Sequence, residues 1–515
     1  MVSTMPGAAE HSDVLIVGAG ISGLGAAYEL RRQCPDRSFV VLDAMESFGG
    51  TWRWHEYPGI RSDSDLFTFG FRFKAWPGPP IATRDEILKY LGEVIEENDL
   101  ASHMRFRHRI VSAAWSSERN LWTVEARVGP DGEPARFTCN FLWMCQGYYR
   151  HAAGYVPDWP GMDTYQGQLV HPQTWPDDLD YHGKRVVVIG SGATAATLIP
   201  AMAPECAHIT MLQRSPTYYF PHQNRNKLAD TLRALELDPL LIHEIVRRKV
   251  VYDQRRFLDR AAAEPDTVKE DLIAGVAAHL PEDVVAEHFT PSYRPWQQRI
   301  AVIPDGDLFK AVQSGKASVV TDQIARFTPE GIELQSGRVL EADIVVTATG
   351  FDISVLGDIA FSIDGKPLTF SQTVNYRGMM FTGVPNLAWI FGYLRAASWT
   401  LRVDLVTDFI CRLLNHMDAI GAARVRVQLR PEDQAMELAP FLDTSIFNPG
   451  YLLRGVNLLP KGGDKPEWRH SQDYSWDKEV LPSVDLDDSC FDYVDRRGRP
   501  LDRRVRVREV VADAS

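Results

Sequence analysis

Two glycine-rich turns constrain this chain more than any other feature, because each stands between a strand-like run and a helix-like run. The first, GAGISG, follows DVLIV and contains Gly18, Gly20 and Gly23. The second, GSGATA, follows RVVVI and contains Gly190, Gly192 and Ala195. Small residues at these spacings permit a tight turn, and the N-terminus of the following helix then faces a pyrophosphate. Two copies predict a redox enzyme that binds two nucleotides.

The residue that ends the next strand after each turn differs in charge. SFVVLD ends in Asp43, a carboxylate that accepts from ribose hydroxyls and repels a 2′-phosphate, as FAD or NAD requires. HITMLQR ends in Arg214, followed by Ser215, and a guanidinium suits a phosphate. We therefore predict FAD at the first turn and NADPH at the second. A solvated arginine at a strand end is the alternative interpretation of Arg214.

Two further runs resemble one another and close the two modules. FLWMCQG ends at Gly147 and ADIVVTATG ends at Gly350, each an apolar strand finishing in glycine. We predict an α/β protein with two Rossmann-like dinucleotide-binding domains and a helical insertion in the second. The predicted boundaries are an FAD-binding domain in 8–150 and, with a C-terminal tail, 351–515; an NADP-binding domain in 151–220 and 295–350; and the insertion in 221–294.

The predicted insertion is rich in Leu, Arg, Glu and Ala at helical spacing. A solvated face is the favoured interpretation of its basic residues, and contact with a membrane or partner is the less favoured one: Arg247, Arg248, Lys249, Arg255 and Arg256. Elsewhere, helices are predicted from Thr83 to Glu97 and from Leu401 to Met417. The aromatic, glycine-rich stretch 49–73 is predicted to be a loop over the flavin.

Composition excludes several classes of protein. The chain has 515 residues, 55 basic and 68 acidic, for a formal net charge of −13, so no global basic field favours nucleic acid. The six cysteines form no CxxC pattern, and neither a metal site nor a redox-active disulfide is predicted. No window reaches the roughly 18 apolar residues of a membrane span, and the N-terminus lacks a secretory pattern. We expect a cytoplasmic protein.

The stretch between the two turns resembles the fingerprint of the Baeyer–Villiger monooxygenases. The matching positions are Tyr165, Gly167, His171, Trp175 and Pro176. The family usually begins this motif with Phe, and related N- and S-oxygenating flavin monooxygenases tend to have Tyr or Phe where Trp175 stands. A second family pattern runs through Gly50, Trp52, Tyr57, Pro58, Gly59 and Asp63. Over most of its length the chain resembles the ethionamide-activating subgroup of these class B flavin monooxygenases.

The resemblance implies an activity and roles for particular residues. NADPH would reduce FAD, and O2 would supply one oxygen atom for insertion next to a ketone carbonyl, giving an ester or lactone, with sulfoxidation of sulfides as a side activity. Arg299 would stabilise the anionic oxygen species and Asp63 would hold that arginine, although a turn aspartate is the alternative for Asp63. Gly50 and Trp52 would contact the flavin. His171 would transmit domain movement rather than act as a general base.

One departure from the family concerns NADPH. Cyclohexanone-type enzymes have Lys directly before the catalytic arginine, whereas Gln298 stands here, so the preference for NADPH depends on Arg214 and Ser215. Two other functions stay open: an N- or S-oxygenating flavin monooxygenase, which needs no arginine beside the reacting oxygen, and a flavoprotein that oxidises NADPH without oxygenating a substrate. The sequence predicts neither the substrate nor the oligomeric state.

Overall fold

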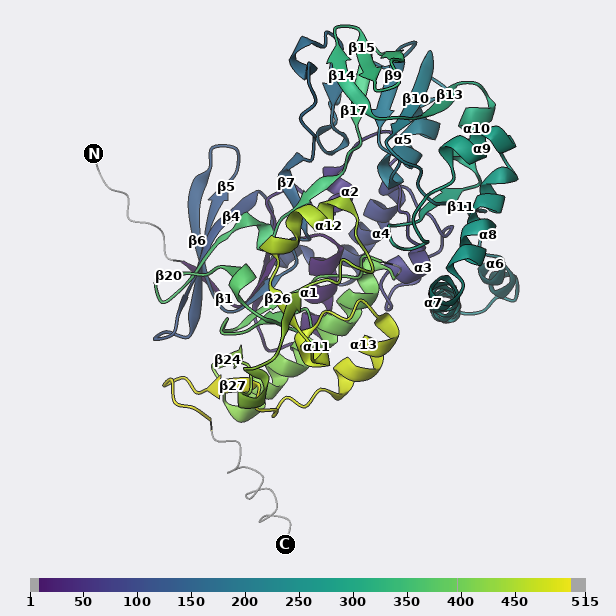
Figure 1. Ribbon diagram of the computed structural model, residues 1–515. Coiled ribbons are helices and arrows are strands. Elements are labelled where there is room, and N and C mark those ends of the chain that lie inside the picture. Colours follow the sequence, from purple (N-terminus) through teal and green to yellow (C-terminus); the bar gives the residue numbers. More distant parts are fainter. Residues whose placement is uncertain (1–8, 396, 502–515) are drawn as a thin grey trace, which may run out of the picture.

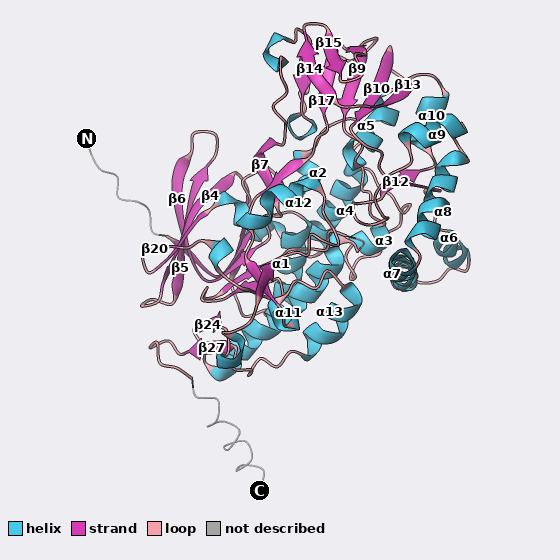
Figure 2. Ribbon diagram, viewed as in Figure 1, coloured by secondary structure: helices cyan, strands magenta, loops and turns pink. Residues whose placement is uncertain are grey.

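The computed structural model describes residues 9–395 and 397–501, which form two lobes, each built around a sheet (Figures 1 and 2). In the larger lobe the strand order is β20-β19-β4-β5-β6-β1-β2-β3, with β23 also paired to β6. These strands are β1 (Glu10–Val17), β2 (Phe39–Leu42), β3 (Met104–Arg105), β4 (His108–Ser116), β5 (Leu121–Val128), β6 (Glu133–Met144), β19 (Ala360–Ile363), β20 (Lys366–Pro367) and β23 (Leu387–Trp389). The end of the predicted tail, 502–515, lies outside the described residues.

The smaller lobe contains a fully parallel sheet in the order β13-β10-β9-β17-β8. Its strands are β8 (Gln168–Val170), β9 (Arg185–Ile189), β10 (His208–Gln213), β13 (Ala317–Thr321) and β17 (Ile344–Thr347). In both lobes the strand before the glycine turn lies between the next strand and the closing strand: β1 between β2 and β6, and β9 between β10 and β17. The prediction of two Rossmann-like folds is confirmed.

The two glycine turns share the same backbone geometry. Gly18 has φ +103° and Gly190 has φ +129°, values that L side chains rarely adopt. A Cβ at Gly18 would lie 2.8 Å from the carbonyl oxygen of Cys145, just beyond β6. A Cβ at Gly190 would lie 2.3 Å from that of Ala348, just beyond β17. Both turns therefore pack directly against the end of the closing strand.

Helices follow the turns and cover the sheets. α1 (Ile21–Gln33) follows the first turn and packs on α11 (Trp399–Ile420), and α5 (Ala193–Met202) follows the second turn. α4 (Arg84–Glu97) begins where predicted, because Thr83 and Glu86 form a reciprocal capping box. α11 is longer at both ends than the predicted helix from Leu401 to Met417.

Two pairs of strands connect the parts of the chain. β7 (Tyr149–Gly154) pairs antiparallel with β18 (Phe351–Ile353), and Figure 1 shows β7 between the lobes. β11 (Tyr219–His222) pairs parallel with β12 (Ala301–Pro304) and brackets a helical segment. That segment contains α6 (Lys227–Ala234), α7 (Pro239–Ala263), α8 (Pro265–Ala277) and α9 (Glu282–His288).

The remaining elements are short. Beyond β12 the smaller lobe has α10 (Asp307–Gln313), β14 (Ile324–Thr328), β15 (Gly331–Leu334) and β16 (Val339–Glu341). The larger lobe is completed by β21 (Asn375–Tyr376), β22 (Met380–Phe381), β24 (Arg424–Val427), β25 (Leu438–Pro440), α12 (Gly450–Gly455), β26 (Lys461–Gly463), α13 (Tyr474–Val480) and β27 (Phe491–Val494). Within 9–395 and 397–501, no helix is long and apolar enough to cross a bilayer.

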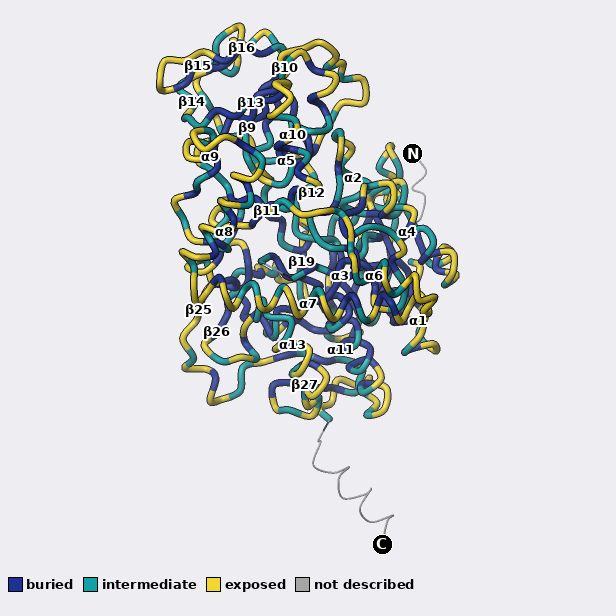
Figure 3. The backbone as a smooth tube through the Cα atoms, turned by 90° about the vertical axis from the view of Figure 1, so that its right-hand side faces the viewer, coloured by how far each residue is buried: buried dark blue, intermediate teal, exposed yellow. Residues whose placement is uncertain are grey.

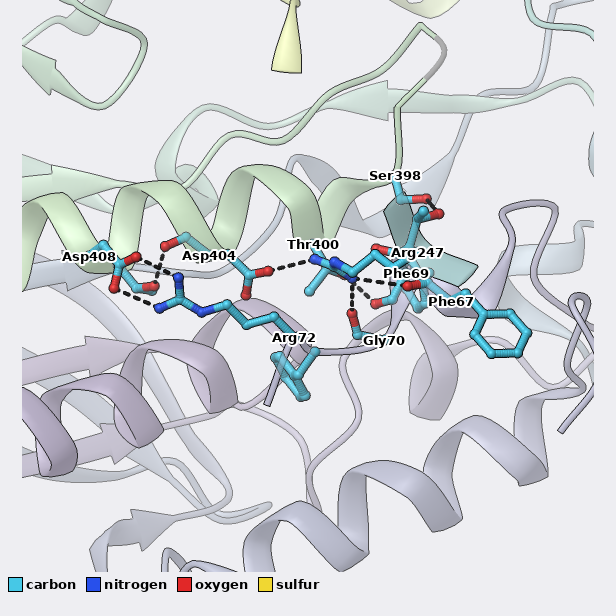
Figure 4. Close-up of polar contacts among 12 residues, drawn as sticks. Phe67, Phe69, Gly70, Arg72, Arg247, Ser398, Thr400, Asp404 and Asp408 are labelled. Carbon is cyan, nitrogen blue, oxygen red and sulfur yellow. Dashed lines mark hydrogen bonds and ion pairs between the residues drawn. The ribbon is translucent and has the colours of Figure 1, made fainter. Parts of the chain in front are cut away.

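The predicted basic face of the insertion is wrong at Arg247. This side chain is buried, because α7 packs against the larger lobe, and it pairs with Asp404 of α11 at 2.6 Å (Figure 4). In Figure 3 the exposed and less exposed parts of α7 alternate along the helix, as expected for one packed and one solvated face. Three of the solvated basic residues pair with acids on the same helix: Arg248 with Glu244, Lys249 with Asp253, and Arg255 with Asp259. Arg255 also pairs with Asp473, and Arg256 lies over the ring of Tyr252.

The stretch 49–73 is not purely a loop. It contains two single-turn helices, α2 (Thr51–Trp54) and α3 (Leu66–Phe69), and every residue of α3 is buried. The Asp65 carboxylate caps α3 by accepting from the amide of Phe67. A helix of one turn is too short to show helical periodicity, which is why the sequence pattern missed it.

Candidate active site

One cavity connects the two glycine turns. Its volume is about 1390 Å³, and its wall includes Gly18, Gly20, Gly190 and Gly192. Sites for single drug-sized ligands measure about 300–1,000 Å³. The cavity therefore has room for more than one ligand, and a nucleotide at either turn would reach into the same space.

The helix that follows each turn presents an uncapped N-terminus to this cavity. α1 and α5 begin after Gly20 and Gly192, with no side-chain cap and no acidic residue in the first turn. A Cβ at Gly20 would lie 3.4 Å from the Cα of Gly50, whereas a Cβ at Gly192 would meet nothing within 4 Å. Free amides at an uncapped helix N-terminus suit the charge of a pyrophosphate.

The predicted ribose-binding residues differ in their surroundings. Asp43 is buried in the cavity wall, and its two carboxylate oxygens accept from the amides of Ala19 at 2.6 Å and Met45 at 2.8 Å. Burial raises the pKa of Asp43 in spite of these bonds. Arg214 and Ser215 follow β10, are exposed, and do not line the cavity. The carboxylate is thus oriented in advance, whereas the arginine faces solvent.

Arg299 and Asp63 meet on the cavity wall. The Arg299 Nε donates to Asp63 Oδ2 at 2.8 Å and an Nη donates to Oδ1 at 2.8 Å, which is a bidentate pair. The other Nη donates weakly to the carbonyl oxygen of Leu394 at 3.3 Å. The Arg299 side chain is 41% exposed. Since both residues line the cavity, a guanidinium held by one edge presents its remaining surface to a ligand.

The charge of Arg299 is secure. Burial lowers the pKa of Arg299, but the Asp63 carboxylate and the surrounding tyrosines raise it by more, so the net shift is upward. The guanidinium is therefore a permanent cation in a wall that also contains several tyrosines. Gln298, the residue that departs from the family pattern, also lines the cavity.

The remaining predicted cofactor-binding residues divide into two groups. Gly50 and Trp52 line the cavity beside the first turn. Gly23 and Ala195 lie behind their turns: a Cβ at Gly23 would come within 1.8 Å of the Gly18 carbonyl oxygen, and Ala195 is fully buried. These two small residues allow the helix to approach the strand closely.

None of the five fingerprint residues lines the cavity, and His171 lies next to the strands that join the lobes. The His171 Nε2 lies 3.1 Å from the carbonyl oxygen of Gly350, and its Nδ1 accepts from the amide of Gln173. Its ring also fills the space where Gly154 lacks a side chain. Burial lowers the pKa of His171, which favours the neutral ring that these two bonds require.

The other fingerprint residues belong to the packing of the smaller lobe. The Tyr165 hydroxyl donates to the carbonyl oxygen of Ala342 at 3.0 Å. Gly167 has no room for a side chain, since a Cβ would lie 2.2 Å from the Tyr165 hydroxyl. Trp175 packs against the core of the smaller lobe, and Pro176 follows it. The motif is therefore structural at most of its positions.

The sequence interpretation missed the aromatic wall around Arg299. It consists of Tyr148, Tyr149, Phe351, Trp399 and Tyr451. The first two directly follow Gly147, at the carboxyl end of a strand, where ligands of α/β proteins bind, and that position could have identified them. Nothing in the sequence around Tyr451 connects it with this site.

Comparisons with known proteins identify the family. Residues 16–76 match a model of the NAD(P)-binding Rossmann-like domain, and residues 71–224 match a model of flavin-binding monooxygenase-like proteins. The FAD-containing monooxygenase EthA of Mycolicibacterium smegmatis is 44% identical over 491 residues, covering 95% of this chain and 98% of that protein. The chain is a class B flavin monooxygenase of the Baeyer–Villiger type. The probable FAD-binding monooxygenase AlmA of Acinetobacter baylyi is 43% identical over 503 residues, covering 97% of this chain and 99% of that protein.

Solved structures agree with this fold. A steroid monooxygenase bound to NADP superposes on 94% of this monooxygenase and 100% of that chain, with a TM-score of 0.74 and 24% identity. A cyclohexanone monooxygenase with bound ε-caprolactone superposes on 94% of this chain and 100% of the other, with a TM-score of 0.72 and 22% identity. The cofactors of this monooxygenase are FAD and NADPH. No group of acidic, His and Cys side chains among the described residues is arranged to hold a metal.

Proposed function

We propose that this enzyme is a Baeyer–Villiger monooxygenase that inserts one oxygen atom from O2 next to a ketone carbonyl and forms an ester or lactone. The observation that carries the proposal is the Arg299–Asp63 pair on the wall of a cavity that reaches both glycine turns. A fixed cation at this place is what a reaction through an anionic oxygen species requires.

The proposed roles follow from the geometry. The two cofactors supply hydride and the activation of dioxygen when they are bound. The amides at the start of α1 and Asp43 would hold FAD, and those at the start of α5 with Arg214 and Ser215 would hold NADPH. Arg299 would stabilise negative charge on oxygen, and Asp63 would keep the guanidinium in place. His171 would couple the lobes through the strands that join them.

A structural neighbour supports the reaction type. The cyclohexanone monooxygenase was solved with ε-caprolactone, which is a lactone. The decisive experiment is a panel of linear and cyclic ketones incubated with NADPH and O2 and analysed by product mass. Products heavier than the ketone by one oxygen atom are expected. A panel that yields no ester or lactone, while NADPH is consumed, would exclude the proposal.

An N- or S-oxygenating activity is the second candidate, and the match of residues 71–224 to the flavin-binding monooxygenase-like model favours it. The two candidates differ in their need for Arg299. If oxygenation of amines and sulfides is the main activity, replacing this arginine with alanine will leave that activity largely intact.

A further inference from the structure

Three tyrosines surround Arg299 and come from distant parts of the chain. Tyr148 directly precedes β7, Tyr149 is its first residue, and Tyr451 lies in α12. All three line the same cavity as Arg299, and the charge of Arg299 acts on each of them. Three phenol hydroxyl groups and the Arg299 guanidinium therefore belong to the same cavity wall.

Ring packing holds these phenols in place. Tyr148 stacks on Trp399, with ring centroids 5.3 Å apart and an interplanar angle of 13°. Tyr149 meets Phe351 edge to face at 3.8 Å, and Phe351 also packs against Tyr451 at 4.5 Å and Tyr148 at 5.5 Å. Since the rings are packed by aromatic neighbours, the hydroxyls keep a defined position.

The hydroxyls form a chain with an unused donor. Tyr148 donates to the Tyr149 oxygen at 3.4 Å, and Tyr451 also interacts with Tyr148. Among the described residues, no acceptor is found for the proton of Tyr149. A phenol both donates and accepts one hydrogen bond, so a chain that donates in one direction leaves one O–H free at its end.

The phenols remain protonated. Burial raises the pKa of Tyr148, Tyr149 and Tyr451, and this outweighs the opposite effect of Arg299. At neutral pH each is a hydrogen-bond donor and none carries a charge.

We propose that the Tyr149 hydroxyl, supported by Tyr148 and Tyr451, donates a hydrogen bond to the carbonyl oxygen of the substrate and so selects ketones over sulfides. This inference rests on the proposed function and specifies how its substrate is recognised. When an oxygen nucleophile bonds to the carbonyl carbon, the C=O π pair moves onto the carbonyl oxygen, and the Tyr149 O–H, which keeps its proton, bonds more strongly to that charge. A thioether sulfur accepts hydrogen bonds only weakly, so sulfoxidation gains little from this donor.

The test compares Tyr149→Phe with the wild-type enzyme on a methyl ketone and the methyl thioether of the same carbon skeleton. We expect kcat/KM for the ketone to fall by about 100-fold, the typical loss for one donor to a developing oxyanion. The value for the thioether should change by less than about twofold, because sulfur makes little use of the donor. Tyr451→Phe should lower the ketone value less, since it acts through Tyr148. Tyr252→Phe, on the exposed face of α7, is the matched control and should change neither value.

If the wild-type enzyme oxidises ketones but no thioethers, the fate of O2 in the variant provides a second test. In Tyr149→Phe, FAD content and NADPH consumption should persist, while hydrogen peroxide replaces ester as the product of O2. An equal loss on both substrates, or unchanged ester formation per NADPH consumed, would overturn the inference. A wild-type enzyme that makes no ester from any ketone would instead refute the proposed function, so the two failures are distinct.

Discussion

Two arginine–aspartate pairs of this monooxygenase have similar chemistry but opposite surroundings. The Arg247–Asp404 pair joins α7 to α11, and both side chains are about nine-tenths buried, with exposures of 10% and 11%. One Nη of Arg247 also donates to the carbonyl oxygens of Phe67, Thr68 and Gly70 (Figure 4). Outside its pair with Asp63, Arg299 has only two long bonds, to the carbonyl oxygen of Leu394 and to the Ser64 Oγ, both at 3.3 Å, and it lines a cavity.

The difference shows how to separate a structural pair from a functional one. The donors of Arg247 are directed at the backbone around α3, so this arginine ties the helical segment to the larger lobe. Arg299 uses one edge for Asp63 and Ser64, and its other Nη makes only a weak bond of 3.3 Å, so one N–H of that Nη has no partner among the described residues. An unused donor on a residue that lines a cavity, rather than the ion pair itself, is the observation behind the role proposed for Arg299.

Replacing Arg247 should give the largest effect and should act on stability. Arg247→Ala leaves the Asp404 carboxylate buried without its partner, and breaking a buried pair costs about 3–5 kcal/mol. We expect a clearly lower Tm by differential scanning fluorimetry and unchanged activity per FAD-containing molecule. Arg248→Ala, one residue along α7, removes only a surface pair and should shift stability by less than about 1 kcal/mol. Equal Tm shifts for the two variants would contradict the assignment.

Replacing Arg299 should act on chemistry instead. Arg299→Ala should lower ester formation by about 10²–10³-fold, the loss expected for one stabilising donor at an oxyanion, while FAD stays bound at the distant first turn. Arg299→Lys should recover little, because a point charge cannot reproduce the bidentate geometry. Asp63→Ala should be milder, since the cation remains. Product mass and the flavin absorbance of the purified variants provide the measurements; an alanine variant with near wild-type ester formation would remove Arg299 from the mechanism.

In contrast to Arg247 and Arg299, Arg214 forms no ion pair with any described residue. Arg214→Ala should weaken NADPH binding by about 10- to 100-fold, equivalent to about 1.5–3 kcal/mol for a hydrogen bond to a charged group, and should spare NADH. The KM values of the wild-type enzyme and the variant for NADPH and for NADH measure these losses. Arg326→Ala, an exposed arginine of the same lobe that pairs with Glu333, is the control. Equal losses for NADPH and NADH would make the role of Arg214 structural.

The smallest effect concerns pH and the same α7 contact. His243 lies one turn before Arg247; its Nδ1 accepts from the amide of Trp76, and its Nε2 lies 3.1 Å from the carbonyl oxygen of Phe71. Burial, with a contribution from Arg247, lowers the pKa of His243 to about 4. Below its ordinary pKa of about 6.5 the unfolded chain therefore binds a proton that the folded chain does not, and stability falls as the pH drops from 6.5 towards 4.

His243→Gln removes this titration. Between pH 7 and pH 5.5 the wild-type enzyme should lose about 1 kcal/mol more stability than the variant, since each unit of pH below the unfolded pKa is worth about 1.4 kcal/mol. Thermal unfolding of both proteins across this range measures the difference. Parallel pH profiles would show that His243 binds its proton at the same pH in the folded and in the unfolded enzyme.

Much of the fold could be predicted because the decisive interactions are local. Gly18 and Gly190 have φ above +100°, a backbone conformation that only glycine adopts readily. The apolar runs before and after each turn predict a strand and a helix. The capping box at Thr83 fixed the start of α4 for the same reason. The catalytic role proposed for Arg299 depends on the family resemblance, because Arg299 and Asp63 are 236 positions apart and no spacing rule connects them.

The sequence alone therefore determined the two nucleotide-binding modules and the sign of the charge at the end of each second strand. Only the tertiary structure decided which arginines use their N–H groups to hold the fold together and which keep an N–H group without a partner in the protein. Arg247 and Arg248 are neighbours in the chain, but the rotation of about 100° per residue places one against α11 and the other in solvent. Likewise, Tyr451, Tyr148 and Arg299 line one cavity although they are far apart in the sequence. No local sequence pattern predicts that these segments come together.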